Sequence, residues 1–208
     1  MNLLKCCWIR KPLNNYNWID LLWFNFIESS KRYISLENAI NIKTPFSTLR
    51  VWIFWKLNEN KIWKKINRND LVDIIMVCKN AKINAIQIYW ECDFWYLKMF
   101  NFLTFSAIKL NDLDNIKEDN NIDFYIIDWK NPWSWEEYNY EKINNYKINK
   151  KFLIAWWIKQ ENILDIYKIF KNNLNFCWVD IATWVDNWEN IDRNKIDKIR
   201  KIVAPFSY

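Results

Sequence analysis

The chain has 208 residues, and its 30 Lys and Arg outnumber its 24 Asp and Glu, which gives a formal charge of +6. With 51% hydrophobic and 26% charged residues, the composition excludes a disordered chain, and no apolar run approaches the roughly 18 residues of a membrane span. The N-terminal sequence is interrupted by charge and is not typical of a signal peptide, so we expect a cytoplasmic protein with no membrane partner.

Short apolar runs alternate with amphipathic stretches along the whole chain. The runs predict eight strands, over Leu3–Cys7, Asp20–Phe24, Leu49–Phe54, Ala85–Ile88, Phe105–Ile108, Phe124–Asp128, Phe152–Ala155 and Val179–Ala182. The amphipathic stretches predict helices over Leu36–Ile42, Leu71–Cys78, Asp112–Ile116, Glu161–Phe170 and Lys195–Ile202. Ser35 is the expected N-cap of the first helix, and Asn69 and Asp70 precede the second. Eight strands, each followed by a helix or loop, predict a parallel sheet closed into a barrel, a single-domain (β/α)8 TIM barrel over residues 1–208.

In such barrels the chemistry is carried at the C-terminal ends of the strands. Here those ends have polar and reactive residues, namely Cys7, Arg32, Gln87, Asp128, Asp180 and the pair Trp156–Trp157. Each alone has an ordinary explanation, such as a buried small thiol for Cys7, a surface charge for Arg32 or a helix cap for Asp128. Their shared position at one rim favours a functional site.

Neither the cysteines nor the net charge indicates a metal site or a nucleic-acid-binding surface. The number of cysteines, five, is odd, there is no C-x-x-C pair, and the chain has no His. These counts argue against a zinc site and a disulfide framework. The positive charge is spread along the chain, so it indicates a solvated surface more than a nucleic-acid face, and it also suits an anionic substrate.

Two residue counts are abnormal, because the chain has no Gly and 16 Trp. Average usage predicts roughly fifteen Gly in a chain of this length. Tight turns, helix C-caps and phosphate loops use glycine for its positive φ or its lack of a Cβ atom. Either this fold avoids every such position, or another residue is written where Gly belongs.

Seven segments at the predicted strand ends carry a distinct pattern. They are K-C-C-W-I at 5–9, S-K-R-Y-I-S at 30–35, V-W-I-F at 51–54, A-I-Q-I-Y-W at 85–90, I-D-W-K-N-P-W-S-W at 127–135, A-W-W-I-K-Q-E-N at 155–162 and V-D-I-A-T-W-V at 179–185. In this order they resemble the phosphoribosylanthranilate isomerases of tryptophan biosynthesis, whose patterns include K-I-C-G-I, A-V-Q-L-H-G and I-D-G-K-x-P-G-S-G. In these segments a Trp stands where the family has Gly, and Tyr89 stands where it has His.

The resemblance implies an Amadori rearrangement of N-(5-phosphoribosyl)anthranilate to 1-(2-carboxyphenylamino)-1-deoxyribulose 5-phosphate, without a metal or organic cofactor. Cys7 would be the base and Asp128 the acid. Alternation along the first strand directs Cys7 into the barrel mouth and Cys6 toward the helices. A thiolate at Cys7 needs a lowered pKa, for which Lys5 or Arg32 could supply positive charge. Asp128 must instead hold a proton, which requires burial or a nearby anion.

The resemblance also implies how the substrate is held. Arg32 would pair with the anthranilate carboxylate, and Gln87, Tyr89 and Asp180 would contact the rest of the substrate. The phosphate would lie on backbone N–H groups at Trp156, Trp157, Thr183 and Trp184. We therefore expect a small phosphorylated substrate, and a protein that is a monomer or a homodimer.

Exchanging all 16 Trp for Gly restores a normal glycine fraction. Our hypothesis is that these positions are Gly in the organism, through UGA codons that are read there as Gly and were translated here as Trp.

Other functions stay open. Another phosphate-binding barrel of histidine or tryptophan synthesis would share the phosphate loops, although a histidine-pathway isomerase would have Asp where this chain has Cys7. An indole-glycerol-phosphate synthase would need a catalytic Lys and an extra N-terminal helix. A basic, aromatic-rich nucleic-acid-binding protein would explain the Trp content and the charge but not the strand ends. An inactive barrel is the third alternative, and Tyr89 is its best support.

Overall fold

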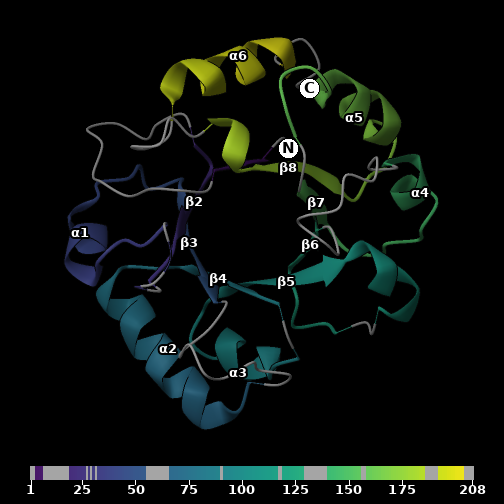
Figure 1. Cartoon of the computed structure of the whole chain (residues 1–208). Helices are drawn as coiled ribbons and strands as arrows, with labels where there is room; N and C mark the ends of the chain where they lie inside the picture. Colours follow the sequence, from purple (N-terminus) through teal and green to yellow (C-terminus); the bar gives the residue numbers. More distant parts are fainter. Residues whose placement is uncertain are drawn as a thin grey trace.

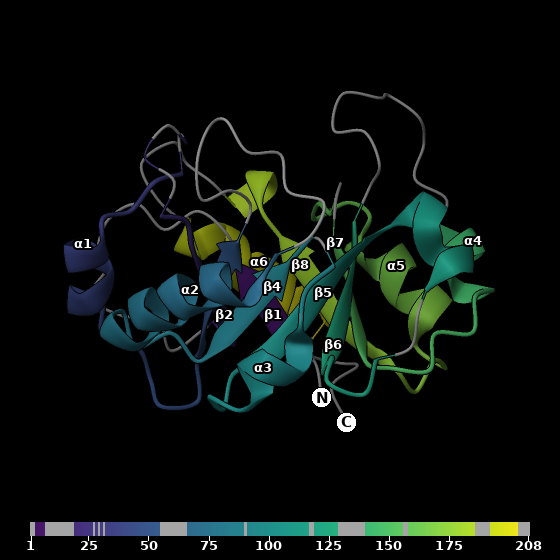
Figure 2. The ribbon, with the colours of Figure 1, turned by 90° about the horizontal axis from the view of Figure 1, so that it is seen from below.

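The computed structural model describes residues 3–6, 19–26, 28, 30, 32–54, 66–89, 91–116, 119–128, 140–155, 158–185 and 192–203. Within them, eight parallel strands pair in chain order, and the first strand pairs with the eighth, which closes the barrel. The helices lie around the outside of the strands (Figure 1) and flank them in the side view (Figure 2). The predicted (β/α)8 fold is confirmed.

The strands follow the short apolar runs of the sequence. They are β1 Leu3–Cys6, β2 Leu21–Phe24, β3 Leu49–Phe54, β4 Ala85–Ile88, β5 Leu103–Lys109, β6 Phe124–Asp128, β7 Phe152–Ala155 and β8 Phe176–Ile181. Two of them begin earlier than predicted, at Leu103 and Phe176. Both starting residues are only half-buried, so the apolar pattern marks the middle of these strands better than their first residues.

The helices are more numerous than predicted, and of those predicted, α1 and α5 are shorter while α2 and α6 are longer. They are α1 Leu36–Asn41, α2 Arg68–Asn80, α3 Phe94–Lys98, α4 Tyr140–Asn144, α5 Ile163–Phe170 and α6 Arg193–Val203, with 3₁₀ helices η1 Leu110–Asn115 and η2 Thr183–Val185. The sequence analysis missed α3, α4 and η2, because five residues or fewer do not repeat an apolar position over two full turns. Within the described residues, no helix has the length and apolar character needed to cross a membrane.

The expected helix starts had different outcomes. Ser35 caps α1 as predicted, since its hydroxyl accepts a hydrogen bond from the backbone N–H of Asn38 at 3.1 Å. The start predicted for α2 is wrong, because Asn67 is the N-cap and Asp70 is the third helical residue of a capping box. An Asp at this position pairs with the cap instead of preceding the helix.

The predicted helix after the fifth strand is a 3₁₀ helix, η1. Its buried residues Leu110 and Leu113 are three apart, which fits the three residues per turn of a 3₁₀ helix. The element next to β5 therefore begins two residues earlier than predicted and is a 3₁₀ helix instead of an α-helix.

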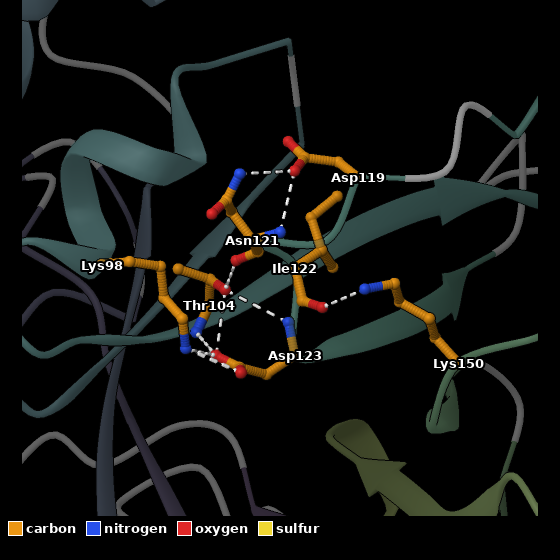
Figure 3. A network of polar contacts seen from close by, with 7 residues as sticks. All are labelled: Lys98, Thr104, Asp119, Asn121, Ile122, Asp123 and Lys150. Carbon is orange, nitrogen blue, oxygen red and sulfur yellow. Dashed lines mark hydrogen bonds and ion pairs between the residues drawn. The ribbon is translucent and has the colours of Figure 1, made fainter.

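A polar network fixes the N-terminal ends of β5 and β6 (Figure 3). Lys98 donates from Nζ to both carboxylate oxygens of Asp123 at 2.7 Å. Asp123 also accepts hydrogen bonds from the backbone N–H and the hydroxyl of Thr104, at 2.8 and 3.0 Å. Lys150 donates to the backbone carbonyl of Ile122 at 3.0 Å. In a barrel of this kind, such contacts at the N-terminal face stabilise the fold, while the opposite face is free to carry chemistry.

The strand register brings charged side chains together at the C-terminal face. Lys5 of β1 pairs with Asp180 of β8, and Asp180 pairs with Ala155 of β7. Ile127 of β6 pairs with Ile154 of β7, so the next residues, Asp128 and Ala155, lie side by side. Asp128 also pairs with Lys109 of β5. Because neighbours in register on parallel strands share a face, these residues form one row on the inner side of the barrel.

Candidate functional site

Asp128 and Tyr89 are hydrogen-bonded to each other at the rim. Asp128 is the last residue of β6, and Tyr89 follows the last residue of β4. The Tyr89 hydroxyl donates to Oδ2 of Asp128 at 3.0 Å, and both residues are half-buried. Two predicted site residues that are 39 positions apart are therefore brought into direct contact.

Lys5 and Asp180 form a buried ion pair on the same inner face. The Lys5 side chain is fully buried, and its Nζ contacts Oδ2 of Asp180, which is also buried. A buried charge persists when an opposite charge compensates it. Lys5, one of the two cations expected to lower the pKa of Cys7, is thus bound to Asp180.

Lys109 is a site residue that the sequence analysis did not identify. It pairs in register with Asp128 at the end of β5, and its side chain is exposed. No motif marks it, since its role depends on a strand that continues one residue beyond the predicted Ile108. It adds positive charge to the rim next to the half-buried carboxyl group.

Gln87 is the most unusual polar residue of the barrel interior. It lies in β4 and is fully buried, and no described residue supplies a hydrogen-bond partner to its Oε1 or Nε2. A buried polar group without a partner costs about 1–3 kcal/mol. A bound ligand with hydroxyl or carboxylate groups would satisfy both atoms, so the position of Gln87 fits its predicted role in substrate binding.

The buried indole of Trp23 lies near two cations. Trp23 lies in β2 and is 4% exposed, and it packs in a small cluster that includes Ile53 and Tyr89. Lys5 Nζ and Arg32 Cζ each lie 5.6 Å from its ring centroid. Among the described residues, none accepts a hydrogen bond from its buried Nε1. The sequence analysis did not select Trp23, although its inward position follows from alternation along β2.

Of the two adjacent cysteines Cys6 and Cys7, only Cys6, the last residue of β1, is described. Cys6 is fully buried. Burial, and next the negative charge of Asp180, hold the pKa of the Cys6 thiol far above its ordinary value. Cys6 therefore stays protonated at neutral pH and is excluded as a base.

The predicted phosphate site is described in part. Trp156 and Trp157 lie outside the described residues, and of Thr183 only the backbone is described, at the start of η2. Trp184 is half-buried, with Lys195 Nζ 5.8 Å from its ring centroid. The first N–H groups of α6 are occupied, since Asp192 accepts hydrogen bonds from the backbone of Asn194 and Lys195 at 2.9 and 3.3 Å.

A cavity of about 630 Å³ opens on the flank of the barrel beside β5. It is lined mainly by residues outside the mouth, including Cys92, Phe94 and Ile116, and it touches the site at Tyr89 and Lys109. Burial raises the pKa of Cys92 to about 12, so this thiol is not a nucleophile at neutral pH. The cavity borders the site but does not contain the row of charged residues.

No family model and no curated protein matches the chain. Solved structures do match. The phosphoribosyl anthranilate isomerase of Thermotoga maritima is 20% identical with a TM-score of 0.73, and the match covers 99% of this chain and 100% of that chain. The enzyme of Pyrococcus furiosus is 15% identical with a TM-score of 0.70, over 99% and 100% of the two chains.

A third match is a phosphoribosyl anthranilate isomerase in complex with reduced 1-(o-carboxyphenylamino)-1-deoxyribulose 5-phosphate. It is 18% identical with a TM-score of 0.68, and the match covers 96% of this chain and 97% of that chain. At these identities the likeness establishes a shared fold over nearly the whole length.

Proposed function

We propose that the chain is a phosphoribosylanthranilate isomerase, which converts N-(5-phosphoribosyl)anthranilate to 1-(2-carboxyphenylamino)-1-deoxyribulose 5-phosphate. The observation that carries this proposal is the half-buried carboxyl group of Asp128, hydrogen-bonded at the C-terminal rim of the barrel. The motif resemblance at the strand ends and the match to solved isomerases support the same reaction. The proposal takes residues 1–208 as one domain and requires no metal or organic cofactor.

The reaction needs an acid that protonates the ring oxygen and a base that removes the C2 proton. Asp128 is the proposed acid, because it ends a strand on the inner face and is only half exposed to solvent. Cys7 is the proposed base, as the family resemblance implies, and the fully buried Cys6 with its raised pKa is excluded from that role. The two proton transfers then occur on residues from β6 and from the end of β1.

Binding follows from the charges of the mouth. The substrate carries a carboxylate and a phosphate, and Arg32 and Lys109 give the rim positive charge for them. Arg32 would bind the carboxylate, and the buried amide of Gln87 would bind polar groups of the substrate. Asp180, bound to Lys5, leaves the middle of the mouth electrically balanced.

The proposal includes glycine at the sixteen Trp positions. Trp23 is the position that supports it, because its bulky indole is buried close to Lys5 and Arg32. The backbone conformation does not support the glycine hypothesis. In the described part of the chain the residues with positive φ are Lys82 and Asn101, and neither is a Trp. The argument at Trp23 therefore rests on side-chain volume, and the intact mass of the protein isolated from its source tests it.

The function is tested by the loss of phosphoribosylanthranilate fluorescence on adding the full chain, in the printed tryptophan form and in a glycine form with all sixteen Trp replaced. The glycine form should turn over the substrate. Its Asp128→Asn variant should lose about 10²–10⁴-fold in kcat, the usual contribution of a general acid. Absence of turnover by both forms, or full activity of the Asp128→Asn variant, would show that the proposal is wrong.

A further inference from the structure

We propose that Ser30 is a positioning residue for Arg32, the residue that binds the substrate carboxylate in the proposed function. Its hydroxyl links the main chain of Arg32 to the end of β2 and thereby sets the point from which the arginine side chain extends. The inference rests on the proposed function and deepens it, because it adds a residue that governs how well the carboxylate is recognised.

The Ser30 hydroxyl accepts two hydrogen bonds. One comes from Nδ2 of Asn25 at 3.0 Å, and the other comes from the backbone N–H of Arg32 at 3.1 Å. A hydroxyl oxygen has two lone pairs, so both are used. Asn25 directly follows the last residue of β2 and is 8% exposed. The hydroxyl therefore connects a buried amide at the end of a barrel strand to the main chain of the loop.

Main-chain hydrogen bonds close the same loop. The backbone N–H of Tyr33 donates to the carbonyl of Ser30 at 3.0 Å, and that of Ile34 donates to the carbonyl of Asn25 at 2.9 Å. Three consecutive N–H groups, beginning with that of Arg32, thus bond back to the start of the loop. Of these three bonds, the first alone ends on a side-chain atom, so it is the one that a substitution of Ser30 removes.

Other contacts of Arg32 act on its side chain. Its Cζ lies 5.6 Å from the ring centroid of Trp23, and the residue is half-buried. Contacts of this kind orient a guanidinium best from a fixed main chain, because a long side chain has many rotamers. Ser30 acts on the main chain, and the side-chain contacts then act from a defined starting point.

The consequence for the substrate is one of binding and not of chemistry. A bidentate pair between a guanidinium and a carboxylate depends on the orientation of the two groups. If the main chain at Arg32 is less ordered, binding has to order it, and this lowers the affinity. The carboxylate takes no part in the proton transfers, so loss of the Ser30 hydroxyl should raise KM and leave kcat nearly unchanged.

The test measures Kd by calorimetry for two ligands of the full-length form that turns over the substrate. One is the product, 1-(2-carboxyphenylamino)-1-deoxyribulose 5-phosphate, and the other is 1-phenylamino-1-deoxyribulose 5-phosphate, which lacks the carboxylate. Ser30→Ala should weaken product binding about five- to twentyfold, because the two lost hydrogen bonds bound the free energy that binding must supply to order the loop. Binding of the carboxylate-free ligand should change less than twofold. Ser30→Thr keeps the hydroxyl and should bind both ligands within threefold of the parent.

Two further variants separate positioning from a general effect on the fold. Ser35→Ala is the matched control, since Ser35 lies three residues after Arg32 and caps α1 through the backbone N–H of Asn38. Its loss should lower the melting temperature and leave both Kd values unchanged. In the Arg32→Ala background, Ser30→Ala should change the Kd of the product less than twofold, because the group that it positions is absent.

The inference and the proposed function fail in different ways. Equal losses for the two ligands, no loss in Ser30→Ala, binding by Ser30→Thr as weak as by Ser30→Ala, or an undiminished loss in the Arg32→Ala background would overturn the role of Ser30. If the chain turns over the substrate and any of these results is found, the function stands without that role. If neither the tryptophan nor the glycine form turns over the substrate, the proposed function fails, and the role of Ser30 fails with it.

Discussion

Two adjacent thiols at the end of β1 should differ sharply in reactivity. Cys6 is fully buried, and its raised pKa leaves almost no thiolate at neutral pH. Cys7 lies outside the described residues, and alternation along the strand predicts that it faces the mouth. Cys6, whose thiol packs in the core, is therefore directly followed in the sequence by the proposed base, Cys7.

We predict that iodoacetamide at pH 8 modifies Cys7 much faster than Cys6, because the thiolate is the reacting form and a raised pKa keeps Cys6 protonated below that pKa. Peptide mass spectrometry over time gives the two rates, and loss of turnover should follow the modification of Cys7. Cys78, which is also fully buried, is the internal reference for an unreactive thiol. Modification of Cys6 ahead of Cys7 would reverse the assignment.

Trp23 is the residue at which the glycine hypothesis has the clearest structural consequence. The indole lies where two cations, Lys5 and Arg32, face the mouth. With Gly at this position, the space between the cations opens to an aromatic carboxylate such as the anthranilate group.

Restoring Trp at position 23 alone in the glycine form should therefore raise KM at least tenfold, because the indole competes for this space. Restoring Trp95 alone is the matched control, since Trp95 is 51% exposed on α3, outside the barrel. Steady-state kinetics on the two single-Trp proteins give the comparison. Equal KM values would mean that the indole leaves the substrate space open.

At the scale of the elements, Arg50 joins two helices to the barrel. It is buried in β3, and its guanidinium donates to the backbone carbonyls of Ala39 at 2.6 Å, Ile42 at 3.0 Å and Ala81 at 2.8 Å. These carbonyls belong to the C-terminal ends of α1 and α2, where a cation also interacts favourably with the helix dipole. Arg50 therefore fixes the position of both helix ends.

Arg50→Met should lower the free energy of unfolding by about 2–5 kcal/mol, because it leaves several buried carbonyls without a donor. Urea denaturation at 25 °C measures the change. The matched control is Arg68→Met, which removes an exposed ion pair with Asp93 and should cost no more than about 1 kcal/mol. Equal stabilities of the two variants would show that the Arg50 contacts contribute little.

The elements also show which parts of the fold follow from local pattern. Apolar runs locate all eight strands, because a strand buried on both faces is a short run of apolar residues. Helices of five residues, such as α3 and α4, have no such signal, and their ends depend on contacts such as the Asp93 cap of α3. Periodicity also fails to separate η1 from an α-helix, since Leu110 and Leu113 fit both.

The site depends on the whole molecule. Strand-end position selects Asp128, Gln87 and Asp180 from sequence, and the family resemblance adds Tyr89. The structure places all four at the C-terminal end or inner face of the barrel. Their partners could not be predicted, because the Tyr89–Asp128 contact spans 39 residues and depends on strand register and side-chain reach. The Lys5 contact with Asp180 likewise requires closure of the barrel. The roles of Cys7, Trp156 and Trp157 stay predictions.

Barrel closure also explains why the charges of the mouth work together. The inner row has a cation at each end, Lys5 and Lys109, and the carboxylates of Asp180 and Asp128 on either side of Ala155 in the middle. One ion pair is internal and buried, while the carboxyl group of Asp128 is half-buried and contacts a phenol. The barrel therefore holds the carboxylate of Asp180 in a buried ion pair, while Asp128, the proposed acid, is half-buried at the rim.

The most direct test of the account follows the C2 carbon of the substrate. In phosphoribosylanthranilate labelled with ¹³C at C2, the glycine form of the chain should replace the hydroxyl-bearing carbon signal with a ketone carbon signal in the ¹³C NMR spectrum. Its Asp128→Asn variant, at the same concentration and time, should leave the original signal. An unchanged C2 signal with the glycine form, or equal conversion by the Asp128→Asn variant, would contradict the proposed isomerisation.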